Sequence, residues 1–176
     1  MRLFVYGTLL SPFDTASLIP SDAIRHPAAV IGRMYHYLPG CYPAIAVPGN
    51  LIQAKGTVDY LVDETHEMSQ DPVSFESFRH IYTNVYHNGF GWIYGELMDI
   101  TNPCEIFPAI DRYEGFGGND PLYHRSLIPV MYGDEMTWGW VYHFDESFPF
   151  EENEDLFVRV LNGNWLSFLK GDDHET

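Results

Sequence analysis

The residues best suited to chemistry are two carboxylates near the end of a predicted helix. The stretch AIDRYEG contains Asp111 and Glu114. Asn102 suits the N-cap of this helix, Pro103 its first position and Gly115 its end. Glu114 then lies at the negative end of the helix dipole, where the dipole and any burial raise the pKa of a carboxyl group. Such a group suits general acid/base chemistry near neutral pH, although a solvated glutamate would fit the spacing too.

Asp111 is the competing carboxylate. It precedes Glu114 by one helical turn and lies on the same face of the predicted helix. Its simplest partners are Arg112 and solvent. Spacing alone leaves Asp111 and Glu114 as alternatives for proton transfer.

A second candidate is the stretch RLFVYGTLL at the start of the chain. Residues 2–6 form an apolar segment that predicts a buried strand, and Gly7 and Thr8 form a turn of small residues at its end. Glycine leaves backbone N–H groups unobstructed, and such groups suit a carboxylate or a developing oxyanion. The simpler interpretation, a tight strand-to-helix connection, is favoured by spacing alone.

Other chemistries find little support in the sequence. The eight histidines are scattered without metal-ligand spacing, and no serine lies in a G-x-S-x-G turn. The glycine-rich stretch GFGGND lacks the Lys-Ser/Thr of a phosphate-binding loop. Cys41 and Cys104 are too isolated for a disulfide framework, which favours a reducing compartment. We expect no metal and no cofactor.

Charge and composition narrow the class of partner. The formal net charge of -16 over 176 residues argues against nucleic acid and against an anionic membrane surface. We find no secretory signal and no run of membrane-spanning length, so we expect a cytoplasmic protein. With 45% hydrophobic and 19% charged residues, the chain is expected to form one domain over residues 1–176.

The predicted elements are mostly strands, and the strands are separated too irregularly for repeated βαβ units. Gly133 and Asp134 predict the turn of a hairpin. Pro108 is expected to kink or break its helix. A further helix, with apolar residues at helical spacing, is expected to end near Gly89. The pattern predicts a small barrel or mixed sheet. The segments are strands over 2–6, 28–38 and 91–100, a weaker strand over 54–62, a helix over 75–86, and a final helix or strand near 156–161.

Several stretches in one order resemble the gamma-glutamylcyclotransferase-like family, which includes gamma-glutamylamine cyclotransferases and AIG2-like proteins. They are FVYGTL, GRMYHYLPGCYPAIAV, GWIYGELMDI, AIDRYEG, LYHRSLIPV and WGWVYHF. The resemblance implies an α+β fold, a small mixed β-barrel with flanking helices known as the cyclotransferase or BtrG-like fold. It also implies that no cofactor is needed.

The resemblance further implies roles for particular residues. Glu114 matches the family's catalytic acid/base, and Arg125 is expected to be a structural partner. The expected substrate-binding residues are Tyr6, Gly7, Thr8, Leu9 and Tyr123.

The expected reaction converts a gamma-glutamyl amine or gamma-glutamyl amino acid to 5-oxoproline and releases the free amine. The expected partner is therefore a small gamma-glutamyl molecule, and the oligomeric state stays open. One alternative is a non-catalytic small-molecule-binding or interaction protein, and another is a hydrolase that yields glutamate. A cavity lined by both Glu114 and Gly7 would favour the enzyme over the non-catalytic protein.

The chain departs from the family pattern in three places, one of which is the glycine-rich spacer in EGFGGNDPLYHR that is expected to reshape the mouth of the pocket. The segment from about 51 to 89 is longer than the compact pattern needs and is read as an insertion, either a lid or a surface for self-association. Leu10 stands where a basic residue is common in the family. These departures leave the substrate open, and the net charge of -16 mildly favours a cationic leaving group such as lysine.

Overall fold

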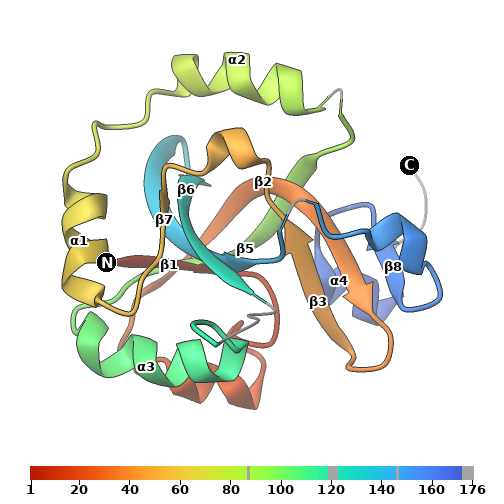
Figure 1. Cartoon of the computed structure of the whole chain (residues 1–176), viewed down its shortest axis with the longest axis horizontal. Helices are drawn as coiled ribbons and strands as arrows, with labels where there is room; N and C mark the ends of the chain where they lie inside the picture. The colour runs from red at the N-terminus through yellow and green to blue at the C-terminus, as the bar shows by residue number, and fades with distance from the viewer. Residues whose placement is uncertain (87, 119–122, 146, 172–176) are drawn as a thin grey trace.

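A closed five-stranded barrel forms the centre of the molecule (Figure 1). This computed structural model describes residues 1–86, 88–118, 123–145 and 147–171. Each barrel strand pairs with the next, β7 pairs back with β1, and this last pairing is the parallel one. In order around the barrel, the strands are β1 (Arg2–Val5), β5 (Gly91–Asp99), β2 (Arg25–Tyr37), β6 (His124–Tyr132) and β7 (Glu135–His143).

The length of β2 lets it serve two sheets. Its first part pairs with β5 in the barrel, and residues 33–37 extend beyond it to pair with β3 (Tyr42–Ala46). On its other edge the same part of β2 pairs with β8 (Phe157–Val160). A short strand, β4 (Ala54–Lys55), joins the outer edge of β6. Figure 1 shows β2 running from the barrel into this side sheet.

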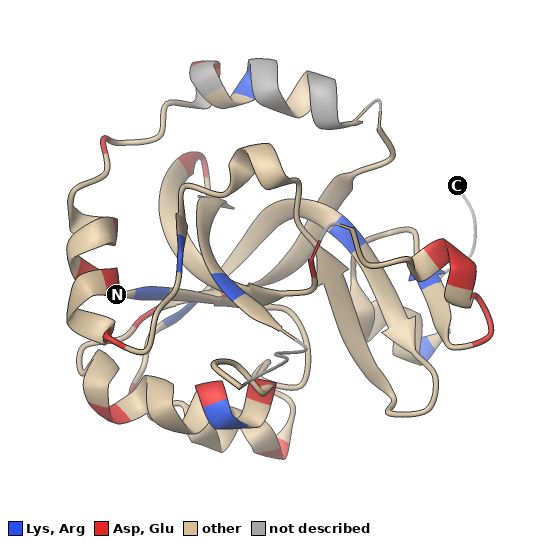
Figure 2. Cartoon of the chain, in the orientation of Figure 1, with Lys and Arg blue, Asp and Glu red and all other residues tan. Residues whose placement is uncertain are grey.

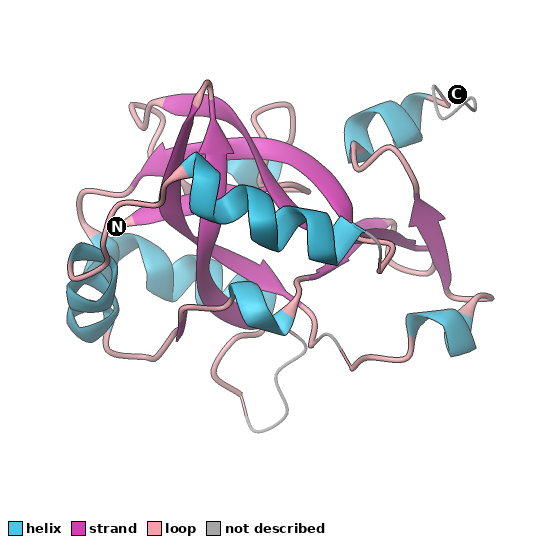
Figure 3. Cartoon of the chain, turned by 90° about the horizontal axis from the view of Figure 1, so that it is seen from above, coloured by secondary structure: helices cyan, strands magenta, loops and turns pink. Residues whose placement is uncertain are grey.

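Helices lie around the barrel rather than between its strands (Figure 3). In the view of Figure 1, α2 lies on the opposite side of the barrel from α3 and the 3₁₀ helix η1, while α1 contacts α3. The helices are η1 (Asp14–Leu18), η2 (Gly49–Leu51), α1 (Tyr60–Met68), α2 (Phe75–Tyr86), α3 (Pro103–Glu114), η3 (Phe150–Asn153) and α4 (Trp165–Lys170).

The first strand is buried on both faces. Leu3 and Val5 pack into one apolar cluster, whereas Phe4 packs into a second cluster on the opposite face. Alternation of side chains along a strand produces this division. The prediction of a central buried first strand is confirmed. The turn that follows β1 therefore begins at a strand that is held firmly in the core.

Most other predicted elements are also confirmed. The hairpin turns at Gly133 and Asp134, where φ of 57° at Gly133 is left-handed, and α2 is followed by Gly89 with φ of 76°. Phe78 is buried and Tyr82 stacks on Trp92, as expected for a packing stripe, while the side chains of Phe75, Ile81 and Val85 lie outside the described residues. The closing segment forms β8 followed by α4.

Two local expectations are corrected by the structure. Pro108 does not break its helix, because α3 continues through it. The proline cannot donate to the carbonyl of residue 104, but that residue is exposed, so solvent can satisfy the carbonyl. The weak strand over 54–62 reduces to β4, because Asp59 caps a helix whose backbone donors Leu61 N and Val62 N lie 3.2 and 3.3 Å from its carboxylate. Local capping overrides the β-propensity of this segment.

Charged side chains lie mainly outside the barrel. In Figure 2 the acidic residues gather on the helices and around η3, whereas most of the barrel ribbon is uncharged. Among the described residues, no helix is both long and apolar enough to cross a membrane.

The cap at Asp59 can be tested directly. Replacing Asp59 with Ala should lower the free energy of unfolding by about 1 kcal/mol, because two N–H groups at the start of α1 lose their acceptor. Asp59→Asn should retain most of the stability, since Asn is an equally good cap. Urea denaturation measures both, with the exposed Asp22→Ala as a control. Equal losses for Ala at positions 59 and 22 would contradict a capping role.

Candidate active site

The turn after β1 is held by close packing and hydrogen bonds. The N–H of Leu10 donates to the carbonyl of Gly7 at 2.9 Å, and the hydroxyl of Thr15 donates to the carbonyl of Thr8. A Cβ at position 7 would lie 2.5 Å from Cγ of Pro43, a separation that real Cβ atoms do not adopt. Glycine is therefore required at position 7 because β3 packs directly against the turn.

Glu114 is the last residue of α3. The helix ends in a left-handed residue, Gly115 with φ of 71°, as the sequence predicted. Burial raises the pKa of the Glu114 carboxyl to about 8, and the charge of Asp111 adds to the rise. Among the described residues, none donates a hydrogen bond to this carboxylate. The direction of the shift agrees with the sequence prediction, and the acid is positioned to hold its proton near neutral pH.

Both candidates line one cavity of about 340 Å³. The cavity lies between the end of β1, the start of β3 and the end of α3. All six residues predicted for the site border it, namely Tyr6, Gly7, Thr8, Leu9, Glu114 and Tyr123. Tertiary folding thus brings residues more than a hundred positions apart to one site.

Aromatic side chains make up much of the cavity wall, and several of the tyrosines are hydrogen bonded. The Tyr6 hydroxyl donates to the carbonyl of Tyr142 at 2.8 Å, and the Tyr123 hydroxyl donates to that of Pro43 at 3.1 Å. Thr8 Oγ1 lies 2.7 Å from the hydroxyl of Tyr113, which ties the turn to α3. Burial raises the pKa of both Tyr6 and Tyr123, so their hydroxyls remain neutral.

The sequence analysis missed part of the wall. Tyr42 and Pro43 line the cavity from β3, and Tyr113 and Tyr142 complete it. The stretch GCYPAIAV lies within a segment that resembles the family, but its sequence carries no signal of a role in the site. Leu10 lies away from the cavity and is buried in the core, so a hydrophobic residue there serves packing.

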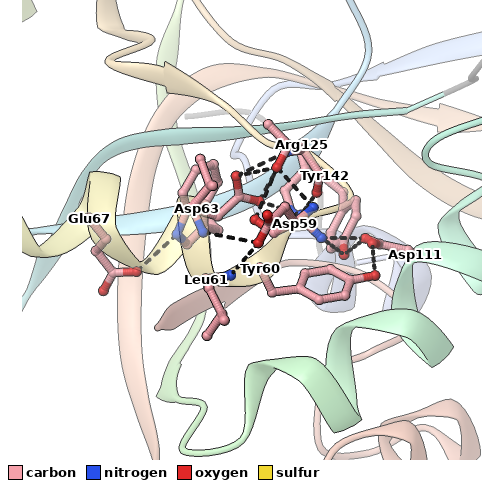
Figure 4. Close-up of polar contacts among 11 residues, drawn as sticks. Asp59, Tyr60, Leu61, Asp63, Glu67, Asp111, Arg125 and Tyr142 are labelled. Atoms are coloured by element: carbon pink, nitrogen blue, oxygen red, sulfur yellow. Dashed lines mark hydrogen bonds and ion pairs between the residues drawn. The ribbon is translucent and has the colours of Figure 1, made fainter.

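A buried ion-pair network lies behind the cavity (Figure 4). The Arg125 guanidinium is fully buried and donates to Asp111 at 2.5 Å and to Asp63 at 2.6 Å. Asp111 also accepts from the hydroxyl of Tyr142 and, at 2.9 Å, from that of Tyr60. Asp111 is therefore fully engaged by these donors, and the expectation that it pairs with Arg112 or solvent is wrong.

This network holds Glu114 in position and contributes to the electrostatic potential at its carboxyl group. Arg125 on β6 connects α1, through Asp63, with α3, through Asp111. The last turn of α3 is thereby fixed against the barrel, and Glu114 with it. Two carboxylates and one guanidinium leave one net negative charge, which opposes ionisation of Glu114. Arg125 acts on the site through Asp111 rather than by facing the cavity.

The segment 51–89 lies outside the cavity wall. Among the described residues, none of those that line the cavity comes from this segment, and α2 lies on the far side of the barrel in Figure 1. A lid made by α2 therefore finds no support. The segment instead supplies Tyr60 and Asp63 to the network around Arg125.

The fold is a small mixed barrel, and one of its cavities is lined by both a carboxyl group and a glycine turn. The chain belongs to the gamma-glutamyl cyclotransferase, AIG2-like family, whose model matches residues 73–167. The match includes Glu114 and Tyr123 and leaves out the turn after β1. Membership supports a cyclotransferase-type function. No curated protein sequence matches the chain.

Two solved structures align with the chain. YkqA from Bacillus subtilis aligns with a TM-score of 0.53 at 16% identity, over 99% of this chain and 43% of that one. This chain therefore spans less than half of YkqA. PH0828 from Pyrococcus horikoshii, described as uncharacterized, aligns with a TM-score of 0.49 at 14% identity, over 100% of this chain and 99% of that one. At such identity the likeness to YkqA shows the fold alone.

The raised pKa of Glu114 makes stability depend on pH. The folded protein holds a proton on Glu114 up to about pH 8, whereas the unfolded chain releases it near its ordinary pKa of 4.5. Stability from this group is therefore present below pH 4.5 and is lost as pH rises towards 8. Glu114→Gln should be more stable than the wild type at pH 8 by about 2–4 kcal/mol and equally stable at pH 4.5.

Urea denaturation at the two pH values measures this difference. Glu105→Gln, an exposed substitution in the first turn of the same helix, is the matched control and should follow the wild type. Parallel pH profiles for the wild type and Glu114→Gln would show that the pKa of Glu114 is not raised.

Proposed function

We propose that the protein is a gamma-glutamyl cyclotransferase that releases an amine from a gamma-glutamyl amide and forms 5-oxoproline. The observation that carries the proposal is that Glu114 and the turn from Gly7 to Leu9 line one cavity. This is the arrangement expected of the enzyme and not of a protein whose Glu114 faces bulk water. The family match supports the same class of reaction.

The turn supplies hydrogen-bond donors for the glutamyl group. Among the described residues, no backbone acceptor takes a hydrogen bond from the N–H groups of Gly7, Thr8 or Leu9. These donors suit the substrate carboxylate or the oxyanion that forms at the γ-carbon. Removing one such donor typically costs about 2.7–4 kcal/mol of transition-state stabilisation.

Glu114 accepts and then returns the proton that is transferred during the reaction. The carboxylate of Glu114 takes a proton from the substrate α-ammonium, and the freed amine attacks the γ-carbonyl carbon and forms the new carbon–nitrogen bond of the lactam. The bond from the γ-carbon to the departing nitrogen then breaks as Glu114 returns that proton to this nitrogen, and the second proton of the attacking nitrogen passes to the released amine, which leaves as an ammonium. A substrate ammonium beside Glu114 offsets the negative field of Asp111, which favours the carboxylate that the first step needs.

Most of the remaining catalysis is orientation. The attacking nitrogen and the γ-carbonyl belong to one molecule, so a cavity that folds the substrate can contribute up to about 7–11 kcal/mol. The tyrosine walls and Pro43 limit the shapes that the substrate can adopt. No metal or cofactor is required by this sequence of steps.

The cavity wall also bears on the leaving group. Among the described lining residues there is no lysine, arginine or histidine, and the outer wall includes Tyr42 and Tyr113. A leaving group that carries a carboxylate would therefore meet rings and no cation. We expect kcat/KM for a gamma-glutamyl alkylamide to exceed that for gamma-glutamylglycine at least tenfold, about 1.4 kcal/mol. Initial rates of amine release measure this ratio, and equal values would exclude selection by the wall.

The reaction itself is tested by mass spectrometry. Wild-type protein is incubated with gamma-glutamyl amides and amino acids, beside Glu114→Gln and the control Glu105→Gln. We expect 5-oxoproline from the wild type and from the control, and a loss of at least 100-fold in Glu114→Gln because amide cannot cycle a proton.

Three outcomes separate the alternatives. Glutamate in place of 5-oxoproline would show hydrolysis, since water would have replaced the amine. Full turnover by a folded Glu114→Gln would overturn the role of Glu114. Absence of any product from the folded wild type across the panel would favour a binding protein of this fold.

A further inference from the structure

A second cavity of about 450 Å³ lies on the other face of β6 and β7. Side chains alternate along β6, so Arg125 points into the ion-pair network on one face while His124 and Ser126 line this second cavity on the other. His143 at the end of β7 and Lys55 on β4 complete this second wall. The two cavities share strands but share none of their described lining residues.

The floor of this second cavity is a buried serine–histidine pair. Nε2 of His143 lies 2.9 Å from the Ser126 hydroxyl, and Nδ1 lies 2.6 Å from the carbonyl of Phe144. A carbonyl only accepts, so Nδ1 carries the proton and Nε2 accepts the proton of Ser126. The tautomer of His143 is thereby fixed.

This pair is suited to binding and not to nucleophilic catalysis. Burial lowers the pKa of His143 to about 4, which makes it a weak base near neutral pH. The group that orients it is a neutral carbonyl, which cannot stabilise an imidazolium as a carboxylate does. The floor is therefore a neutral, polar surface whose Ser126 oxygen can still accept a hydrogen bond.

The rim carries charges of both signs that influence each other without forming an ion pair among the described residues. Strand pairing places Lys55 opposite Ser126 and His124 opposite His143. Asp145 accepts from the N–H and hydroxyl of Ser147 at 2.9 and 2.6 Å, and these bonds lower its pKa and keep it ionised. Within the described residues, no ion pair joins Asp145 to either Lys55 or His124.

We propose that this second cavity binds a small zwitterion, an α-amino acid, with its carboxylate towards Lys55 and His124 and its ammonium towards Asp145. A single molecule with both charges can satisfy the separated charges of the rim. The net charge of -16 repels a small anion from the molecule as a whole, whereas a zwitterion carries no net charge. This inference does not depend on the proposed cyclotransferase activity.

The two lysines of the chain provide an internal comparison. Lys55 borders the cavity, and Lys170 is exposed at the end of α4. In protein labelled with carbon-13 only at lysine, titration with L-alanine should give a saturable shift of the Lys55 signal and leave Lys170 unchanged. Acetate and methylammonium, at the same ionic strength, each supply one of the two charges. We expect each to bind about fivefold more weakly, as for the loss of one exposed charge pair.

One variant tests the contact with the ammonium group, and a second serves as its control. Asp145→Asn should weaken alanine binding about fivefold and leave acetate binding unchanged or slightly stronger. Asp134→Asn, in the hairpin turn of β6 and β7, makes the same change of charge away from the cavity and should bind alanine like the wild type.

The proposal fails if alanine produces no saturable shift at Lys55, or if it shifts Lys170 equally. It also fails if acetate binds as tightly as alanine, since the cavity would then be a simple anion site. An Asp145→Asn protein that is folded and binds alanine at wild-type strength would remove Asp145 from the contact and overturn the zwitterion assignment.

Discussion

The buried guanidinium of Arg125 is the constraint on which the arrangement of the site depends. A charged group in the core is tolerated only when its partners are fixed, and here Asp63 and Asp111 hold it from two helices. The rings of Phe107 and Phe116 lie 4.7 and 4.6 Å from its central carbon. Loss of the guanidinium would leave two buried carboxylates without their cation, so β6, α1 and α3 are interdependent.

The position of Glu114 and part of its raised pKa follow from this network. The ion pair fixes Asp111, and the last turn of α3 carries Glu114 to the cavity that Gly7 also lines. Burial raises the pKa of Glu114, and the same Asp111 that anchors the helix adds to the rise. Asp111 therefore both anchors the helix and helps to raise the pKa of the candidate acid/base. The raised pKa makes the folded protein less stable at higher pH.

The sequence predicted elements best where the signal was local. The double-sided burial of β1, the hairpin at Gly133 and the end of α3 at Gly115 each follow from a short pattern of apolar residues and glycines. The prediction was wrong where two local signals competed, as in the segment where Asp59 starts a helix among β-branched residues. There the buried pairing of Asp63 with Arg125, invisible in a linear pattern, favours the helix.

By itself, then, the sequence determined a mostly β class, the turn at Gly7 and the placement of Glu114 at a helix end, because turns, caps and strand alternation depend on neighbours in the chain. The choice of a barrel over a mixed sheet was implied only by the family resemblance. Only the tertiary structure decided that Gly7 and Glu114 share a cavity, that Asp111 belongs to Arg125, and that the opposite face of β6 holds a second cavity. Those relations depend on closure of the barrel, which brings together residues far apart in the chain and assigns each face of a strand to different surroundings.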